Sequence, residues 1–240
     1  MENFRNLFRI GFLSFLIGGC CTGTADIVMN GHDVNHVQPP EIQRKVAIEK
    51  LLRSTIAIID DDGTIKLPVC TGVWISKNLI VTAAHCVDDD KLVFDYATAD
   101  DYKAQKSHKS TLVGIDKDTD LALLYAPRED EHPVVSFSKE LIYPGDPVDL
   151  VGHPIGYDWT YMKGHVSAIR LNMKGPNDKI DKVVQISAPV WMGNSGGAAF
   201  DAAGNLVGIC SWINKSGPQL SFFIHKDVVE EFLIKQLSKH

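Results

Sequence analysis

Short apolar runs rich in β-branched and aromatic residues follow one another along the chain from about Ser54 onward. Turn-forming pairs such as Asp62-Gly63, Pro144-Gly145 and Gly204-Asn205 separate some of them. Short strands at this spacing, without long helices between them, are typical of β-barrels and sandwiches rather than of β-α-β units. The pattern therefore predicts an all-β body, with strands near 55–59, 73–75, 79–82, 91–94, 112–115, 121–125, 147–151, 164–169, 183–187, 198–200, 206–212 and 220–224.

In two segments the apolar residues have the spacing of a helix instead. Residues 41–53 predict a short helix with Ile42, Val46 and Leu52 facing inward. A second helix is predicted near the C-terminus, between Lys226 and Lys239. Its apolar face comprises Val228, Val229, Phe232, Leu233 and Leu237.

The polar, proline-bearing stretch 126–145 predicts a crossover between two β halves. We therefore expect one β unit over residues 54–130. A second unit, including the C-terminal helix, is expected over residues 131–240.

The first nineteen residues predict a secretory signal. Arg5 and Arg9 precede the apolar run 10–17, which is shorter than the roughly 20 residues that span a bilayer. The sequence Ile17-Gly18-Gly19-Cys20 resembles the lipobox of bacterial lipoproteins, which implies cleavage after residue 19 and lipidation of Cys20. Residues 20–53 would then be a polar tether and a short helix, and the protein would be exported and lipid-anchored in the bacterial cell envelope. A plain signal peptide, and hence a secreted protein, is the alternative.

The composition changes this picture little. The chain has 240 residues, of which 45% are hydrophobic and 22% charged, which excludes disordered and collagen-like classes. The formal net charge of −6 disfavours a nucleic-acid partner, because phosphate binding needs a basic face.

Three short motifs carry candidate chemistry. They are Val-Thr-Ala-Ala-His-Cys over 81–86, Asp-Thr-Asp-Leu-Ala-Leu-Leu over 118–124, and Gly-Asn-Ser-Gly-Gly over 193–197. A serine hydroxyl is a weak nucleophile and needs an adjacent base. Histidine suits that role near neutral pH, and a buried aspartate fixes its tautomer. Glycines around the serine permit a tight turn that aims backbone N–H groups at one point.

In composition and in the order His85, Asp120, Ser195, these motifs resemble those of the chymotrypsin-like (trypsin-like) serine peptidases, over about residues 54–238. The resemblance implies two six-stranded antiparallel β-barrels and a C-terminal helix. It also implies a serine endopeptidase that forms an acyl-enzyme on protein or peptide substrates without a metal or organic cofactor. Ser195 would be the nucleophile, His85 the general base, Asp120 the residue that orients it, and the N–H groups of Gly193 and Ser195 the oxyanion hole. The segments 151–156, 164–167 and 221–224 look most like bacterial high-temperature-requirement proteases.

The resemblance further implies a disulfide between Cys70 and Cys86, whereas Cys210, in an apolar run, is expected to be a buried thiol. The segment 209–212 resembles the strand that pairs with the substrate, so Ser211 and Trp212 are expected to bind it, and Ser211 should also contact Asp120.

Departures from trypsin bear on specificity. Pro189 occupies the position of the aspartate that selects basic P1 residues, and Ile213 replaces a glycine that opens the pocket. We therefore expect a restricted cleft and an apolar or small P1 residue. Asn194 stands where trypsins carry the aspartate that captures a new N-terminus, which makes activation by that route doubtful.

Other interpretations of these motifs are weaker. Asp116, Asp118 and Asp120 alternate like the start of a calcium loop, but the sixth position is Leu121 rather than glycine and the twelfth is Pro127 rather than glutamate. Gly-x-Ser-x-Gly also fits the α/β-hydrolase elbow, but that fold places the acid and the histidine after the serine. A catalytically weak peptide-binding or chaperone-like member of the same fold is the alternative from another functional class.

Overall fold

The computed structural model describes residues 40–61, 66–87, 93–174, 179–213 and 220–239. The predicted signal peptide, Cys20 and the predicted tether up to residue 39 lie outside the described residues. No helix in the described part of the chain combines the length and the apolar character needed to cross a membrane.

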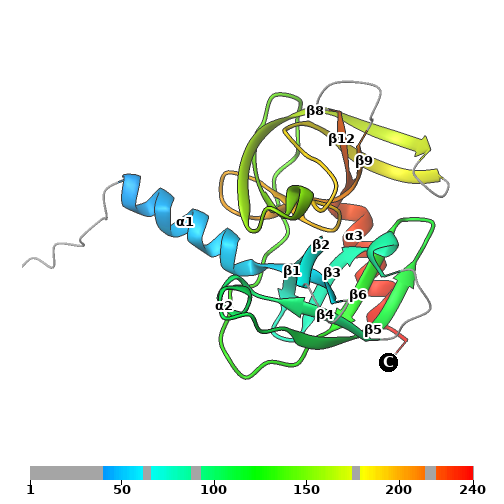
Figure 1. Cartoon of the computed structure of the whole chain (residues 1–240). Helices are drawn as coiled ribbons and strands as arrows, with labels where there is room; N and C mark the ends of the chain where they lie inside the picture. The colour runs from blue at the N-terminus through cyan, green and yellow to red at the C-terminus, as the bar shows by residue number, and fades with distance from the viewer. Residues whose placement is uncertain (1–39, 62–65, 88–92, 175–178, 214–219, 240) are drawn as a thin grey trace, which may run out of the picture. The chain divides into compact units, whose positions relative to one another are not determined.

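Two closed six-stranded antiparallel barrels make up the body, as expected, with a helix at the C-terminus (Figure 1). The first barrel has the strand order β1-β2-β3-β6-β5-β4 and the second the order β10-β11-β12-β9-β8-β7. The first contains β1 (Thr55–Asp61), β2 (Lys66–Ser76), β3 (Leu79–Ala83), β4 (Val93–Ala97), β5 (His108–Asp116) and β6 (Leu121–Tyr125). The second contains β7 (Pro147–Gly152), β8 (Thr160–Lys174), β9 (Lys179–Ser187), β10 (Ala198–Phe200), β11 (Leu206–Ile213) and β12 (Ser221–His225).

Within the described residues there are also three α-helices and two 3₁₀ turns. They are α1 (Pro40–Ser54), α2 (Ala99–Lys103) and α3 (Lys226–Leu237), with the 3₁₀ turns η1 (Ala84–Cys86) and η2 (Pro154–Gly156). The sequence pattern did not predict α2, which begins with a capping box in which Thr98 and Asp101 exchange side-chain to backbone hydrogen bonds.

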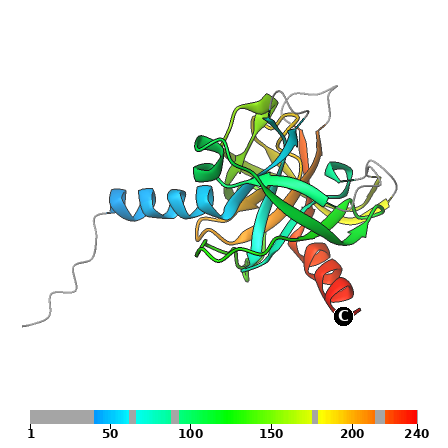
Figure 2. The ribbon, with the colours of Figure 1, turned by 60° about the horizontal axis from the view of Figure 1, so that its bottom comes forward.

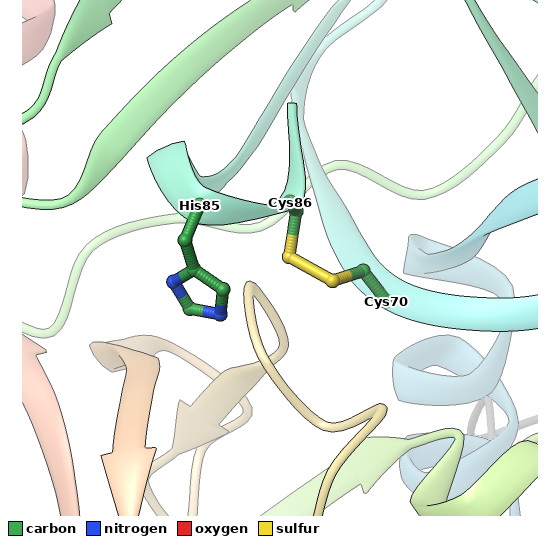
Figure 3. Close-up of side chains that lie close together, drawn as sticks. All are labelled: Cys70, His85 and Cys86. Atoms are coloured by element: carbon green, nitrogen blue, oxygen red, sulfur yellow. A yellow bond between two sulfur atoms is a disulfide. The ribbon is translucent and has the colours of Figure 1, made fainter. Parts of the chain in front are cut away.

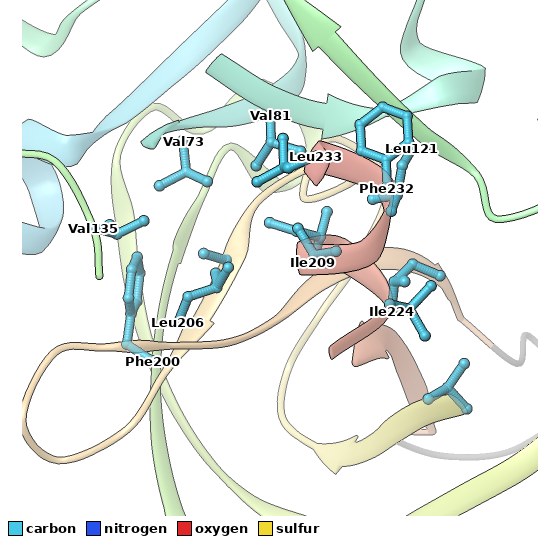
Figure 4. Close-up of a cluster of buried hydrophobic side chains, with 14 of the residues drawn as sticks. Val73, Val81, Leu121, Val135, Phe200, Leu206, Ile209, Ile224, Phe232 and Leu233 are labelled. Carbon is cyan, nitrogen blue, oxygen red and sulfur yellow. The ribbon is translucent and has the colours of Figure 1, made fainter. Parts of the chain in front are cut away.

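One apolar cluster joins the barrels to each other and to α3 (Figure 4). Val81 and Leu121 come from the first barrel, Ile209 and Ile224 from the second, and Phe232 from the helix, and all five are buried. Burial of such side chains contributes roughly 1.5–3 kcal/mol each. The cluster fixes one barrel against the other, so side chains from both can form a single site.

The predicted inner face of the first helix is wrong for Ile42 and Val46 but holds for Leu52, which is partly buried against the apolar cluster. Ile42 and Val46 are 45% and 55% exposed, and the helix instead buries Leu51 in its last turn. The apolar packing of α1 lies at this end, while the earlier turns project from the body (Figure 2) and keep a polar contact through Arg44, which is hydrogen-bonded to Tyr161 of β8. The prediction for α3 holds for its four buried residues between Val228 and Leu233, but Leu237 in the final turn is 52% exposed.

Candidate active site

His85 and Asp120 become neighbours through the pairing of β3 with β6. The register places Ala83 opposite Leu121, so His85, two residues beyond Ala83, and Asp120, one residue before Leu121, emerge at the same end of two adjacent strands. The side chains meet there: His85 Nδ1 lies 3.0 Å from Oδ1 and 2.9 Å from Oδ2 of Asp120. Because an ionised carboxylate only accepts, Nδ1 carries the proton and Nε2 is left free for a substrate-side partner.

Asp120 is held from several directions. Its side chain is fully buried and its φ of +57° lies in the left-handed region, which aspartate tolerates better than most residues. The backbone N–H of His85 donates to Oδ1 at 3.0 Å, and the N–H of Ala84 donates to the Asp120 carbonyl at 3.0 Å. The η1 turn therefore fixes both the peptide and the carboxylate of Asp120.

The second barrel supplies a further donor to this carboxylate. Ser211 Oγ donates to Asp120 Oδ2, as expected. The register of β11 with β12 shifts between Cys210 and Trp212, so Ser211 is the extra residue of a β-bulge. A bulge re-aims one side chain without disturbing the alternation on either side. Ser211 consequently faces Asp120.

The loop that carries Ser195 is hydrogen-bonded to both barrels. The N–H of Thr71 in β2 donates to the Ser195 carbonyl at 2.8 Å, while the N–H of Gly196 donates to the Cys210 carbonyl of β11 at 2.8 Å. Gly196 has a φ of +80°, and a β-carbon there would clash with the Thr71 carbonyl and the Thr82 hydroxyl. Only glycine fits at position 196, which explains the glycine that follows the serine.

The residues before Ser195 form a tight turn that leaves two amides free. Asn194 N–H donates to the Trp191 carbonyl at 3.1 Å, and Gly193, with a φ of +96°, takes the third position, which a type II turn reserves for glycine. The N–H of Ile155 donates to the Met192 carbonyl at 2.7 Å. Since a trans peptide points its N–H away from its C=O, the Gly193 N–H is directed to the opposite side. Neither this N–H nor that of Ser195 donates to any group in the described ranges.

The side chains predicted to react, those of Ser195 and His85, are not hydrogen-bonded to each other. Ser195 Oγ and His85 Nε2, both in the described part of the chain, form no hydrogen bond, and the His85 side chain is 39% exposed. Catalytic hydrogen bonds are often long in ligand-free structures and tighten when substrate binds.

A disulfide joins Cys70 to Cys86, with Cα atoms 6.0 Å apart, as the resemblance implied. It lies beside His85 (Figure 3). The Sγ atom of Cys86 is 3.6 Å from the Ser195 carbonyl oxygen. Within the described ranges, Cys70, His85 and Cys86 are the group whose ligand atoms cluster closely enough, within 4.8 Å, to hold a metal ion. The two sulfurs are bonded to each other, however, and metal binding needs thiolates. Cys210 is a buried thiol, and burial raises its pKa well above the ordinary range.

The residues predicted to shape the specificity pocket fall into two groups. Ile213 packs with the buried cluster of the second barrel, and Trp212 stacks on Phe222 with ring centroids 4.9 Å apart. Pro189 is exposed, whereas Val190 beside it is buried. Residues 214–219, which follow Ile213 in the chain, lie outside the described residues, so the roles of Pro189 and Ile213 remain predictions.

Asn194, at the position where trypsins carry an aspartate, is buried. Its Nδ2 donates to the Trp191 carbonyl at 3.1 Å, and its Oδ1 has no partner among the described residues. A β-carbon on Gly152 would clash with this Oδ1. Asn194 is thus a neutral buried side chain within the turn over residues 191–194, here called the oxyanion turn because the N–H of its Gly193 is a predicted oxyanion donor. The segment 27–28 considered as a captured N-terminus is not described.

Sequence reasoning missed two polar residues behind the oxyanion turn. Thr71 Oγ1 donates to the Gly193 carbonyl at 2.7 Å and lies 2.9 Å from Nδ1 of the fully buried His153. Burial lowers the pKa of His153 to about 3. The sequence did point to this region, because the segment 151–156 resembles high-temperature-requirement proteases. That resemblance did not identify His153 as a functional residue.

Comparison with known proteins agrees with this architecture. Residues 70–209 match the family model described as a trypsin-like peptidase domain. The serine endoprotease DegS of Haemophilus influenzae is 30% identical over 189 residues, which cover 76% of this chain and 54% of DegS. A probable periplasmic DegP-like serine endoprotease of Pseudomonas fluorescens is 36% identical over 154 residues, which cover 62% of this chain and 30% of that protein. The chain thus spans about a third to about half of the length of these relatives.

Solved structures match as well. The HtrA-type protease AlgW, solved with a tripeptide, has a TM-score of 0.67 and 28% identity, over 77% of this chain and 60% of AlgW. The serine endoprotease of Yersinia pestis also gives a TM-score of 0.67, at 24% identity and over 81% of this chain and 66% of that chain, which supports the fold alone.

Two barrels with a serine loop, a histidine and an aspartate at their junction define the class of the serine peptidases. Within that class, the chain belongs to the trypsin-like peptidase family, among its HtrA-type members.

Proposed function

We propose that the protein is a serine endopeptidase that uses Ser195, His85 and Asp120. The observation that carries the proposal is the hydrogen-bonded line from Ser211 through Asp120 to His85, next to a serine loop with two free amides. Ser195 Oγ attacks the carbonyl carbon of the scissile bond and passes its proton to His85 Nε2. The N–H groups of Gly193 and Ser195 bind the resulting oxyanion.

The remaining steps follow from the same groups. His85 returns the proton to the leaving amine as the C–N bond breaks, which leaves an acyl-enzyme on Ser195. Water, deprotonated by His85, then hydrolyses the ester and restores the serine. Asp120 stays ionised and holds His85 in the Nδ1–H tautomer. No step in this sequence requires a metal or an organic cofactor.

The substrate is a protein or peptide segment that lies in extended form along β11, with an apolar or small P1 side chain. Packing of Ile213 into the second-barrel cluster supports this preference, because a branched side chain there occupies space that a large P1 residue needs. Apolar pockets discriminate by only ~1–3 kcal/mol per methylene, so the preference should be graded rather than absolute.

We also propose export to the cell envelope, with a lipid anchor on Cys20. The basic and apolar pattern of residues 1–20 supports it, and so does the disulfide, which persists outside the cytosol. Metabolic labelling with a radioactive or clickable palmitate tests the anchor. Wild type should incorporate label and C20A should not, and equal labelling of the two would contradict it.

A fluorophosphonate probe and a peptide pool together test the enzymatic proposal. The folded chain should react covalently at Ser195 and cleave peptides, and S195A should do neither. The absence of a Ser195–His85 hydrogen bond within the described structure favours one alternative, a weakly catalytic peptide-binding member of the family. Saturable peptide binding without cleavage by the wild type would establish that alternative and reject the peptidase.

A further inference from the structure

The Thr71 hydroxyl connects the oxyanion turn to a buried histidine. Its oxygen lies 2.7 Å from the Gly193 carbonyl oxygen and 2.9 Å from His153 Nδ1. A carbonyl oxygen only accepts, so the single hydroxyl proton of Thr71 is donated to Gly193. His153 Nδ1 must therefore carry a proton and donate it to Thr71 Oγ1. The contacts assign His153 the Nδ1–H tautomer, with an unprotonated Nε2.

The surroundings keep the His153 ring neutral and fixed. The residue is fully buried, its Nε2 has no hydrogen-bond partner within the described ranges, and burial lowers its pKa to about 3. The ring meets Trp159 edge to face, with centroids 4.5 Å apart and planes at 88°. Trp159 in turn donates from Nε1 to the Thr55 carbonyl of the first barrel at 3.2 Å. His153 can therefore act as a permanent donor at neutral pH.

The segment around His153 restrains both peptides of the oxyanion turn. The N–H of Ile155 holds the Met192 carbonyl at 2.7 Å, which sets the direction of the Gly193 N–H. The relay from His153 through Thr71 holds the Gly193 carbonyl and thus the next peptide. The His153 carbonyl also occupies the space that a Gly193 side chain would need.

We infer that His153 is a positioning residue for the oxyanion hole, which it holds in the catalytic geometry by donating from Nδ1 to the Thr71 hydroxyl. The role rests on the proposed peptidase function, and His153 itself touches neither substrate nor reacting atoms. An oxyanion donor acts only in the transition state, so loss of its positioning lowers kcat and leaves KM nearly unchanged.

The kinetic test uses pairs of variants that remove or keep the hydrogen bonds. H153L and T71V should lower kcat roughly 10- to 100-fold, which is no more than the smallest loss of kcat, roughly 100-fold, expected when an oxyanion donor is deleted outright. The KM of both variants should stay within about twofold of the wild-type value. H153N, whose Nδ2–H can replace Nδ1–H, and T71S, which keeps the hydroxyl, should recover most of kcat. S110A is the control, since it also removes a buried hydroxyl that donates to a backbone carbonyl, Ser110 to Phe94 at 3.1 Å, and it should leave kcat unchanged.

The structural test is independent of activity. Long-range ¹H–¹⁵N spectra of the wild-type chain should show His153 as the Nδ1–H tautomer, without titration between pH 5 and 9. An Nε2–H tautomer, or titration near neutral pH, would overturn the inference. This measurement also decides the question if H153L or T71V does not fold.

The two possible failures can be told apart. If the wild type cleaves peptides and H153L is equally active, or if H153N is as slow as H153L, the positioning role is rejected and the peptidase stands. If the wild type neither cleaves nor reacts with the fluorophosphonate, the peptidase fails and the positioning role fails with it, whichever tautomer the spectra show.

Discussion

Ser211 Oγ, on a strand of the second barrel, donates a hydrogen bond to Asp120 Oδ2, at the edge of the first. Asp120 is fully buried, and His85 is its other side-chain partner. A hydrogen bond to a buried carboxylate is worth about 1.5–3 kcal/mol. The position of His85, the proposed general base, thus depends on a residue from the opposite barrel.

Replacing Ser211 by alanine should lower kcat/KM by roughly tenfold or more, because about 1.4 kcal/mol corresponds to each factor of ten. Hydrolysis of a peptide substrate measures the effect, and circular dichroism should show an intact fold. S110A is a suitable control, since Ser110 is also buried and donates to a backbone carbonyl, that of Phe94, at 3.1 Å. Equal activities of S211A and S110A would contradict a role for Ser211.

Removal of the disulfide should destabilise the chain. Cys70 and Cys86 are 16 residues apart, and closing a loop of this length contributes about 3 kcal/mol to the free energy of unfolding. Denaturant unfolding of C70A/C86A should show this loss. A dithiol reductant should bring the wild type down to the same value and leave the double variant unchanged. Reductant sensitivity of the double variant would show that another sulfur is responsible.

Opening the predicted pocket should change specificity. In I213G the branched side chain that packs on the second-barrel cluster is gone, so large P1 residues should gain access. The ratio of kcat/KM for phenylalanine to that for alanine at P1 should rise at least roughly tenfold, since each methylene is worth ~1–3 kcal/mol. A matched series of peptides that differ only at P1 measures this ratio. An unchanged ratio would mean that Ile213 does not line the P1 pocket.

Burial of a neutral histidine should make stability depend on pH. The pKa of His153 is about 3 in the folded chain, against about 6.5 for an unfolded histidine. The unfolded chain therefore binds a proton below about pH 6.5 that the folded chain does not bind until about pH 3. This contribution to stability is fully present above pH 6.5 and is lost as the pH falls, by about 2 kcal/mol at pH 5.

Denaturant unfolding at pH 8 and pH 5 checks this linkage. The wild type should lose more stability between the two pH values than H153N does, and the difference should be about 2 kcal/mol. His225, whose pKa burial lowers to about 4, remains in both proteins and so cancels in the comparison. If the free energy of unfolding falls by the same amount between pH 8 and pH 5 in the two proteins, then His153 is accessible to protons in the folded state.

The strand pattern was sufficient for an all-β body, and the resemblance carried by the three motifs for the two barrels, for the bond from Ser211 to Asp120 and for the disulfide. Pattern and resemblance did not predict that α1 buries Leu51 rather than Ile42 and Val46, because tertiary packing on the barrels selects the last turn of this helix. Nor did they find Thr71 and His153. These residues are 82 positions apart, and they meet only because the β2 strand runs behind the oxyanion turn.

The hydrogen bond from the Thr71 amide to the Ser195 carbonyl has a consequence for how activity arises. Ser195, the proposed nucleophile, is held by a strand of the first barrel although its own loop belongs to the second, so we expect that neither barrel alone forms the proposed active site. Two fragments, separated within the segment 126–146 that joins β6 to β7 and expressed separately, should each be inactive. Peptide cleavage should appear only when the two fragments bind each other, so activity would report their association.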